Sequence, residues 1–206
     1  MGLRLRLASR NRRPRHASQC RAAVTIAFER RWPGMAALCV DMAFNRMKLI
    51  LLGNAGAGKS TMARRLIGSA NIPRLSLDEI AWDQGTRRKP LTDSLVLLSE
   101  FLGAKEQWVI EGCYGDLIEA ALPHCTELRF LNPGIETCVA HCNRRPWEAS
   151  KFSSAEQQNA MLGQLIQWVK EYETRNDEYG LKRHRQIFDS FSGAKREYTS
   201  TASYEG

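Results

Sequence analysis

The sequence predicts an α/β protein in which helices cover both faces of a parallel sheet of four or five strands. Three observations support this fold class. Short apolar runs are bounded by glycine or polar residues, amphipathic segments of helical period follow them, and a glycine-rich loop joins the first run to a helix. Alternation of strands and helices along a chain is typical of a three-layer fold with a parallel sheet.

The predicted strands are short segments that cover residues 48–52, 73–77, 108–110 and 127–131. The first is a continuous apolar run bounded by glycine, which is typical of a strand covered on both faces. Residues 75–77 instead alternate apolar and polar side chains. No fifth strand is visible in the pattern, so the domain is predicted to end at residue 193 and residues 194–206 to form a tail.

The predicted helices fill the intervals between the strands. They cover residues 59–68, 92–106, 114–122, 135–145, 153–175 and 178–190. Thr92 is the expected N-cap of the second helix, and Ser153 with Glu156 has the spacing of a capping box. Cys138 and Cys142 lie four residues apart, and we expect both to be buried on one helix face as small hydrophobic side chains.

The excess of positive charge belongs to the first 46 residues. They contain ten arginines and only two acids, Glu29 and Asp41, whereas residues 47–206 carry 20 basic and 20 acidic side chains. Three interpretations stay open for residues 1–46: an organelle transit peptide, a nucleic-acid-binding arm, or upstream sequence from a start codon assigned too early. We favour the third because Met47 directly precedes the first predicted strand, and we expect disorder under all three. The balanced charge of the remainder makes nucleic acid an unlikely partner.

The cysteines and apolar runs indicate a compartment. Six cysteines contain no Cys-x-x-Cys pair and follow no signal peptide, which favours reduced thiols in the cytoplasm. The apolar runs are too short to cross a bilayer, so no membrane association is expected. The oligomeric state is not predicted.

A phosphate-binding loop is the most specific motif of the chain. Residues 53–60 match the pattern G-x-x-x-x-G-K-[ST] between an apolar strand and a helix, which is the context of a P-loop. Its glycines let backbone N–H groups surround an anion, Lys59 is expected on the β- and γ-phosphates, and Ser60 on Mg²⁺. The alternative is a glycine-rich turn without a ligand. The residues expected to hold ATP are Gly53, Asn54, Ala55, Gly56, Ala57, Gly58, Lys59, Ser60 and Thr61.

Two acids follow predicted strands and are expected beside the loop. Ligands in such sheets bind at the carboxyl ends of the strands. Asp78, after the second strand, is predicted to orient a substrate hydroxyl as its base or to hold magnesium through water. Glu111, after the third strand, is predicted to be a Walker B-like magnesium ligand. The alternatives are an N-cap for Asp78 and an exposed loop carboxylate for Glu111.

Basic side chains near residues 144–155 predict a mobile lid. Arg144 and Arg145 lie there, in a segment with few inward apolar residues, and arginines of this kind stabilise the charge of a transferring phosphoryl group. The alternative is a solvated charge cluster at a helix end. Arg175 is expected in surface ion pairs, and His184 is expected at the surface.

Three segments together resemble a known family. They are GNAGAGKST at 53–61, SLDEIAW at 76–82 and WVIEGCYG at 108–115. They resemble the P-loop kinases of the adenylate kinase and shikimate kinase group, most closely small topology-modulation or adenylate-kinase-like proteins, over about residues 47–190. The resemblance implies a lid arginine at 144 or 145. The segment after Glu111 lacks the proline and arginine of adenylate kinases, and Asp78 lacks the Asp-x-Asp partner of shikimate kinases, so neither AMP nor shikimate is supported as acceptor.

The leading functional hypothesis is phosphoryl transfer from ATP, with Mg²⁺, to a small metabolite or nucleotide. Its catalytic residues would be Lys59, Asp78, Arg144 and Arg145, and its metal ligands Ser60 and Glu111. One alternative is a nucleotide-binding regulatory ATPase without a small-molecule acceptor. Another is a nucleic-acid-binding ATPase that uses the basic leader. A GTPase is disfavoured because the sequence has no Asn-Lys-x-Asp motif.

Overall fold

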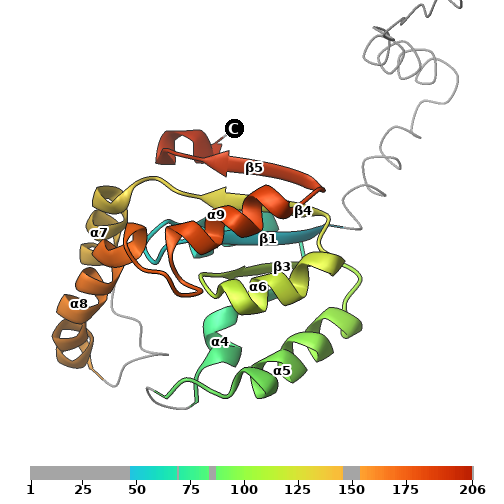
Figure 1. Cartoon of the computed structure of the whole chain (residues 1–206), viewed down its shortest axis with the longest axis horizontal. Coiled ribbons are helices and arrows are strands. Elements are labelled where there is room, and N and C mark those ends of the chain that lie inside the picture. Colours follow the sequence, from blue (N-terminus) through green and yellow to red (C-terminus); the bar gives the residue numbers. More distant parts are fainter. Residues whose placement is uncertain (1–46, 69, 84–86, 146–153, 206) are drawn as a thin grey trace, which may run out of the picture. The chain divides into compact units, whose positions relative to one another are not determined.

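A computed structural model describes residues 47–68, 70–83, 87–145 and 154–205. The expectations for residues 1–46, and for residues 146–153 of the predicted lid, lie outside this part of the chain. The described residues contain a five-stranded sheet in the order β2-β3-β1-β4-β5, and all its pairings are parallel (Figure 1). The predicted α/β class is confirmed, and of the four or five parallel strands expected the sheet has five.

The order of the strands places the phosphate loop at the centre of the sheet. The strands are β1 (Lys48–Gly53), β2 (Arg74–Ser76), β3 (Trp108–Gly112), β4 (Glu127–Leu131) and β5 (Ala194–Tyr198). β1 pairs with β3 on one side and with β4 on the other. The chain therefore winds first to one side of β1 and then to the other, which makes the carboxyl end of β1 the point where ligands of such sheets bind.

Helices cover both faces of the sheet. One apolar cluster joins it to α4 (Leu77–Ala81), α5 (Leu91–Ala104), α6 (Gly115–Ala121) and α9 (Leu181–Ser190). The other joins it to α3 (Lys59–Ile67), α7 (Ile135–Asn143) and α8 (Ala155–Lys170). Three short 3₁₀ helices complete the described elements: η1 (Leu122–His124), η2 (Glu171–Glu173) and η3 (Thr201–Glu205).

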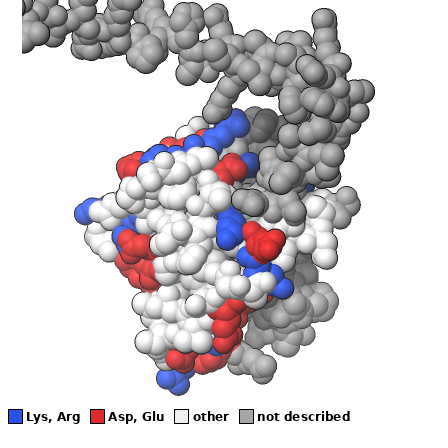
Figure 2. Space-filling model, turned by 90° about the vertical axis from the view of Figure 1, so that its right-hand side faces the viewer, with Lys and Arg blue, Asp and Glu red and all other residues white. Residues whose placement is uncertain are grey.

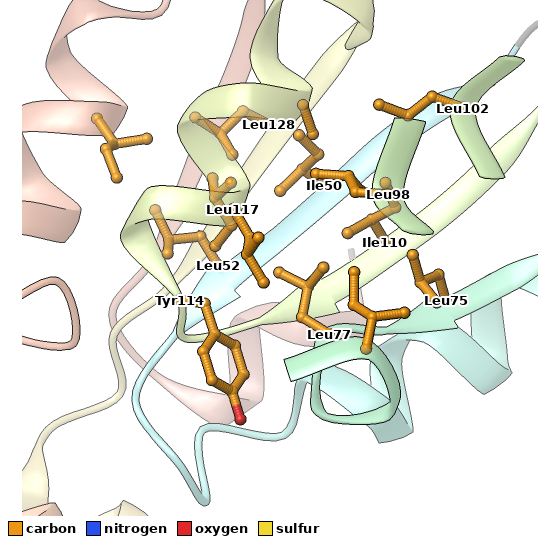
Figure 3. Close-up of a cluster of buried hydrophobic side chains, with 14 of the residues drawn as sticks. Ile50, Leu52, Leu75, Leu77, Leu98, Leu102, Ile110, Tyr114, Leu117 and Leu128 are labelled. Carbon is orange, nitrogen blue, oxygen red and sulfur yellow. The ribbon is translucent and has the colours of Figure 1, made fainter. Parts of the chain in front are cut away.

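Alternate side chains of β1 enter opposite cores. Ile50 and Leu52 belong to the first cluster, and Leu49 and Leu51 to the second, all with no exposed surface. This alternation follows from the two-residue period of a strand. Figure 3 shows the first cluster, with Tyr114 at its margin and the tyrosine hydroxyl directed away from the leucines.

The expectation of a tail after residue 193 is wrong, because residues 194–198 form β5. Among the residues that the structure describes, β5 pairs with β4 alone and so lies at an edge of the sheet. Its Lys195 and Arg196 are exposed, while Tyr198 is buried. Edge strands commonly carry charged residues, which protect their open side from aggregation. A strand of this composition lacks the apolar run by which the inner strands were predicted.

Several helix boundaries differ from those predicted. α5 begins at Leu91 with Pro90 as its N-cap, so the prediction of Thr92 in that role is wrong. Proline has a fixed φ that suits the start of a helix. Ser154, one residue after the expected Ser153, caps α8 by accepting a hydrogen bond from the Gln157 N–H at 3.2 Å. α4 was not predicted, and the last helix begins at 181 rather than 178.

The surface carries charges of both signs. Figure 2 shows one face of the molecule, where basic and acidic side chains lie among larger uncharged areas. This agrees with the equal numbers of basic and acidic residues after position 46. Within the described ranges, no helix combines the length and the apolar character that crossing a bilayer requires.

Candidate nucleotide and acceptor site

The phosphate loop connects the end of β1 to the first residue of α3. Lys59 is the first residue of α3, and its side chain folds back over the loop. The Lys59 Nζ donates hydrogen bonds to the backbone oxygens of Gly53 at 2.9 Å and Asn54 at 2.8 Å. Only 8% of Lys59 is exposed. The sequence thus places a buried ammonium group at the loop, where a phosphate would be neutralised.

Gly56 and Gly58 are two of the three loop glycines whose backbone conformation other residues rarely adopt. Gly56 has φ +80° and Gly58 has φ +91°. A Cβ atom at position 56 would lie 2.3 Å from the carbonyl oxygen of Cys138, well inside van der Waals contact. The Nδ1 of His141 donates to the carbonyl of Gly56 at 2.7 Å. The loop is therefore packed directly against the backbone of α7.

The loop is also supported from outside its motif. The side-chain amide of Asn54 donates to the backbone oxygen of Val169 in α8 at 3.1 Å. The hydroxyl of Tyr204, in η3, donates to the backbone oxygen of Ala57 at 2.7 Å. These bonds fix the loop from two distant segments, so its amide groups are preorganised for a ligand.

The two predicted metal ligands lie together. The Ser60 hydroxyl donates to Oε1 of Glu111 at 2.9 Å, and Glu111 is only 4% exposed. Pairing of Glu111 with Leu51 of β1 brings the acid to the loop, as expected from the shared carboxyl edge. The described residues hold no group of three His, Cys, Asp or Glu side chains suited to a metal. Magnesium fits nonetheless, because in nucleotide sites it takes one or two protein oxygens beside phosphates and water.

The acceptor end of the site contains a hydrogen-bonded series of three side chains. Asp78 lies in the first turn of α4, directly after β2. Its Oδ1 accepts a hydrogen bond from the Tyr114 hydroxyl at 2.6 Å, and Trp82 Nε1 donates to the same hydroxyl at 2.6 Å. Burial, and then the negative charge of Asp78, raise the pKa of Tyr114, so the phenol stays protonated and donates to the carboxylate. Asp78 is thereby oriented.

Cys113 follows β3, and the charged groups of the candidate site influence the pKa of its thiol. Burial raises the pKa of this thiol to about 12. Lys59 and Arg175 act in the opposite direction, and Asp78 and Glu111 raise the pKa further. The raised pKa keeps Cys113 protonated, which excludes it as a nucleophile at neutral pH.

The predicted lid arginines lie at the end of α7. Arg144 is the C-cap of this helix, and both Arg144 and Arg145 are exposed. The N–H of Arg145 donates to the backbone oxygen of Cys142 at 3.3 Å. His141, one helical turn before Arg145, contacts the phosphate loop. The backbone of Arg144 and Arg145 therefore lies close to the loop. Their action on a phosphoryl group stays a prediction.

The surface position expected of His184 is wrong, since this residue has no exposed surface. Its Nδ1 accepts from the Tyr172 hydroxyl at 2.8 Å, and its Nε2 donates to the backbone oxygen of Cys113 at 2.9 Å. Burial lowers its pKa to about 4. The signal was present in the sequence, because Ile187 and Phe191, three and seven positions on, place His184 on the apolar face of its helix.

Sequence reasoning missed the roles of two tyrosines. Tyr114 and Tyr204 reach Asp78 and the phosphate loop from segments far away in the chain. No local pattern marks either residue. The positions of Lys59, Ser60, Asp78 and Glu111 were predicted from the loop motif and from the carboxyl edge of the sheet.

Comparisons with known proteins give a distant likeness in fold. Neither family models nor curated proteins match this chain. Among solved structures, it is similar to a shikimate kinase from Acinetobacter baumannii in complex with shikimate, at 18% identity and a TM-score of 0.45, covering 80% of this chain and 90% of that one. It is also similar to a gluconokinase from Sinorhizobium meliloti 1021, at 15% identity and a TM-score of 0.45, covering 77% and 86%. Both neighbours are kinases, and the function of this chain has to be argued from its own residues.

Proposed function

We propose that this protein transfers the γ-phosphoryl group of ATP, bound with Mg²⁺, to a hydroxyl group of a small metabolite or nucleotide. The observation that carries the proposal is the position of Glu111. It pairs with Leu51 of β1 and with Ser76 of β2, two residues before Asp78, and its carboxylate accepts a hydrogen bond from Ser60, which directly follows Lys59. A phosphate-binding cation, a metal-binding acid and a carboxylate suited to an acceptor are thus grouped at one edge of the sheet.

The nucleotide end would bind the phosphates and the metal. Backbone N–H groups of the loop and the positive end of α3 would receive the phosphate oxygens. Lys59 would exchange its bonds to the loop carbonyls for the β- and γ-phosphates. Ser60 and Glu111 would hold Mg²⁺, the hydroxyl directly and the carboxylate directly or through water. The metal supplies positive charge beside the transferring group.

The acceptor end would supply a base. The acceptor oxygen forms a bond to the γ-phosphorus while the bond from that phosphorus to the bridging oxygen of ADP breaks. The hydroxyl proton passes to Asp78, whose carboxylate is oriented by Tyr114. The products are ADP and the phosphorylated acceptor. Arg144 or Arg145 would add charge stabilisation from the lid. Positioning and electrostatics supply most of the rate in such reactions.

The test is phosphoryl transfer by the full chain. Purified protein with Mg²⁺ and γ-labelled ATP is incubated with a panel of nucleosides, nucleoside monophosphates and hydroxylated metabolites, and the label in each product is measured. At least one acceptor should gain label faster than water. Asp78→Asn should remove the transfer and leave the affinity for Mg·ATP unchanged.

The same assay separates the kinase from its alternative. If ATP binds but no acceptor raises turnover above hydrolysis, the proposal fails in favour of a regulatory nucleotide-binding ATPase. That alternative shares Lys59, Ser60 and Glu111 with the kinase, but it gives no role to the carboxylate of Asp78. An unchanged rate in Asp78→Asn would point in the same direction.

A further inference from the structure

Trp82 is an exposed tryptophan whose position is fixed by the residues around it. At 37% exposed, it is the most exposed aromatic residue of the described ranges. It follows α4 as its C-cap, and its backbone pairs with that of Arg88 in an antiparallel bridge. Its Nε1 donates to the Tyr114 hydroxyl at 2.6 Å. The indole is therefore held at its backbone and at its ring nitrogen, while part of its surface stays open to solvent.

The indole and the predicted base share one hydrogen-bonding partner. The Tyr114 hydroxyl that accepts from Trp82 donates to Oδ1 of Asp78, also at 2.6 Å. Tyr114 is only 3% exposed, whereas Asp78 and Trp82 on either side of its hydroxyl are exposed. A single buried hydroxyl group therefore separates the indole from the carboxylate, and one small ligand can reach both.

The charges beside the indole favour an uncharged ligand group. Arg88, whose backbone pairs with that of Trp82, is already bound through its Nη2 to Oδ2 of Asp116 at 3.1 Å. The Arg88 guanidinium also lies over the ring of Tyr114, 4.7 Å from the ring centroid. The carboxylate of Asp78 would repel an anion at the same place. The indole therefore offers a flat apolar surface rather than a charge to a ligand.

We propose that the exposed indole of Trp82 stacks on an uncharged ring of the phosphoryl acceptor, an assignment that rests on the function proposed above. A nucleobase stacks on an indole through its π face, and a sugar ring packs on it through the C–H groups of one side. Because the indole is fixed before the ligand arrives, stacking costs little conformational entropy. The acceptor class is thus a hydroxylated ring compound, a nucleoside or a sugar, whose hydroxyl group reaches Asp78.

Binding of ring and acyclic probes to the full chain tests this assignment. Mg·AMP-PNP first fills the nucleotide end, and uridine, methyl β-glucoside and glycerol are then titrated by calorimetry. All three probes are uncharged and carry hydroxyl groups, but glycerol has no ring. Trp82→Phe keeps an aromatic ring and loses the Nε1 donor, whereas Trp82→Leu loses both. The control is Met161→Ala, which removes an apolar side chain of the same exposed fraction, 37%, from α8.

Wild type should bind uridine or methyl β-glucoside more tightly than glycerol, and the tighter of the two identifies the acceptor as a nucleoside or a sugar. Trp82→Leu should lower the affinity for that probe by about 5- to 100-fold, the range of stacking on an aromatic side chain. Trp82→Phe should retain most of the affinity, and Met161→Ala all of it. Glycerol binding should be the same in all variants.

Two results would overturn the assignment. One is a wild type that does not prefer a ring probe to glycerol. The other is an equal affinity for the ring probe in Trp82→Phe and Trp82→Leu, since Trp82 would then act at most through the Tyr114 hydroxyl. The affinity of each variant for Mg·AMP-PNP shows whether it is folded, and Trp82→Met, which also lacks a ring, replaces the leucine variant if that one is not.

The outcome for Trp82 is separable from the outcome for the kinase function. A protein that binds the ring probe through Trp82 but transfers no phosphoryl group would refute the kinase and keep the stacking surface. A protein that phosphorylates an acyclic acceptor at the same rate in wild type and Trp82→Leu would keep the kinase and refute the stacking surface.

Discussion

The two ends of the site are built in different ways. The predicted nucleotide end is formed mainly by one continuous segment, residues 53–61, with Glu111 of β3 beside Ser60. The predicted acceptor end combines Asp78 from α4 with Tyr114, the N-cap of α6, and these two residues meet only in the folded protein. A site formed by one continuous segment can be recognised from a sequence motif. A site whose residues come from separate segments is recognised from contacts in the folded protein.

The largest effect is expected at Lys59. Lys59→Ala removes the buried ammonium that lies between the Gly53 and Asn54 carbonyls, and with it the charge that would neutralise the phosphates. Phosphoryl transfer should fall by more than about 100-fold, since such groups act mainly on the charge of the transition state. The rate of label transfer from ATP measures this, with the exposed Lys105→Ala as control. Equal rates in the two variants would remove the loop from the mechanism.

The next prediction concerns His184, whose Nε2 donates to the backbone oxygen of Cys113, the residue before Tyr114. Its pKa is about 4 in the folded protein and 6.5 in an unfolded chain, so only the unfolded chain takes up the proton between these values. Stability should therefore fall by up to about 3 kcal/mol as the pH drops from 6.5 to 4. Urea unfolding across this range measures the slope. His184→Asn should flatten it and the exposed His124→Gln should not; an equal slope in all three would disprove the buried neutral imidazole.

Gly56 tests how strictly the nucleotide end depends on its backbone. Gly56→Ala places a Cβ against the Cys138 carbonyl at a positive φ, and it should destabilise the fold by about 1–3 kcal/mol. Thermal unfolding measures the loss. Gly163→Ala is a matched control, since its Cβ would meet no atom within 4 Å. That control should stabilise α8 by about 0.5–1 kcal/mol because alanine favours helices over glycine. An unchanged unfolding temperature for Gly56→Ala would show that the loop backbone shifts to accommodate the added Cβ atom.

The smallest effect is expected at Tyr114. Its substitution tests whether the acceptor end acts independently of the nucleotide end. Tyr114→Phe removes the hydroxyl that donates to Asp78 and accepts from Trp82 but keeps the ring in the core. Loss of one such bond is worth about 1 kcal/mol, so transfer should slow by roughly fivefold to tenfold. The affinity for Mg·ATP should not change, as calorimetry would show. A loss of ATP affinity would mean that the ends are not independent.

The sequence predicted what local rules determine. The range of β4 agrees with the prediction to the residue, and its apolar side chains, Leu128, Phe130 and Leu131, are buried. Ser60 and Glu111 were expected together, since carboxyl ends of neighbouring parallel strands share one edge. Cys138 and Cys142 are buried as expected, at 2% and 1% exposed.

What could not be predicted depends on tertiary contacts. β5 was not predicted, because an edge strand that carries Lys195 and Arg196 lacks a run of apolar residues. The surface ion pairs expected of Arg175 exist, yet the stacking on Trp168 that buries this residue arises only in the fold. The direction of the Tyr114 hydroxyl likewise depends on where α4 places Asp78.

The bond from Tyr204 to the phosphate loop has a consequence for synthesis. The donor, Tyr204, and the acceptor, Ala57, lie 147 positions apart in the chain. The phosphate loop is therefore synthesised long before the residue that donates this hydrogen bond. We therefore expect the phosphate loop to reach its final support only after β5 has paired with β4 and η3 has formed. A ribosome-bound chain that stops at residue 193 should bind ATP more weakly than the released protein, and equal binding would refute this order of events.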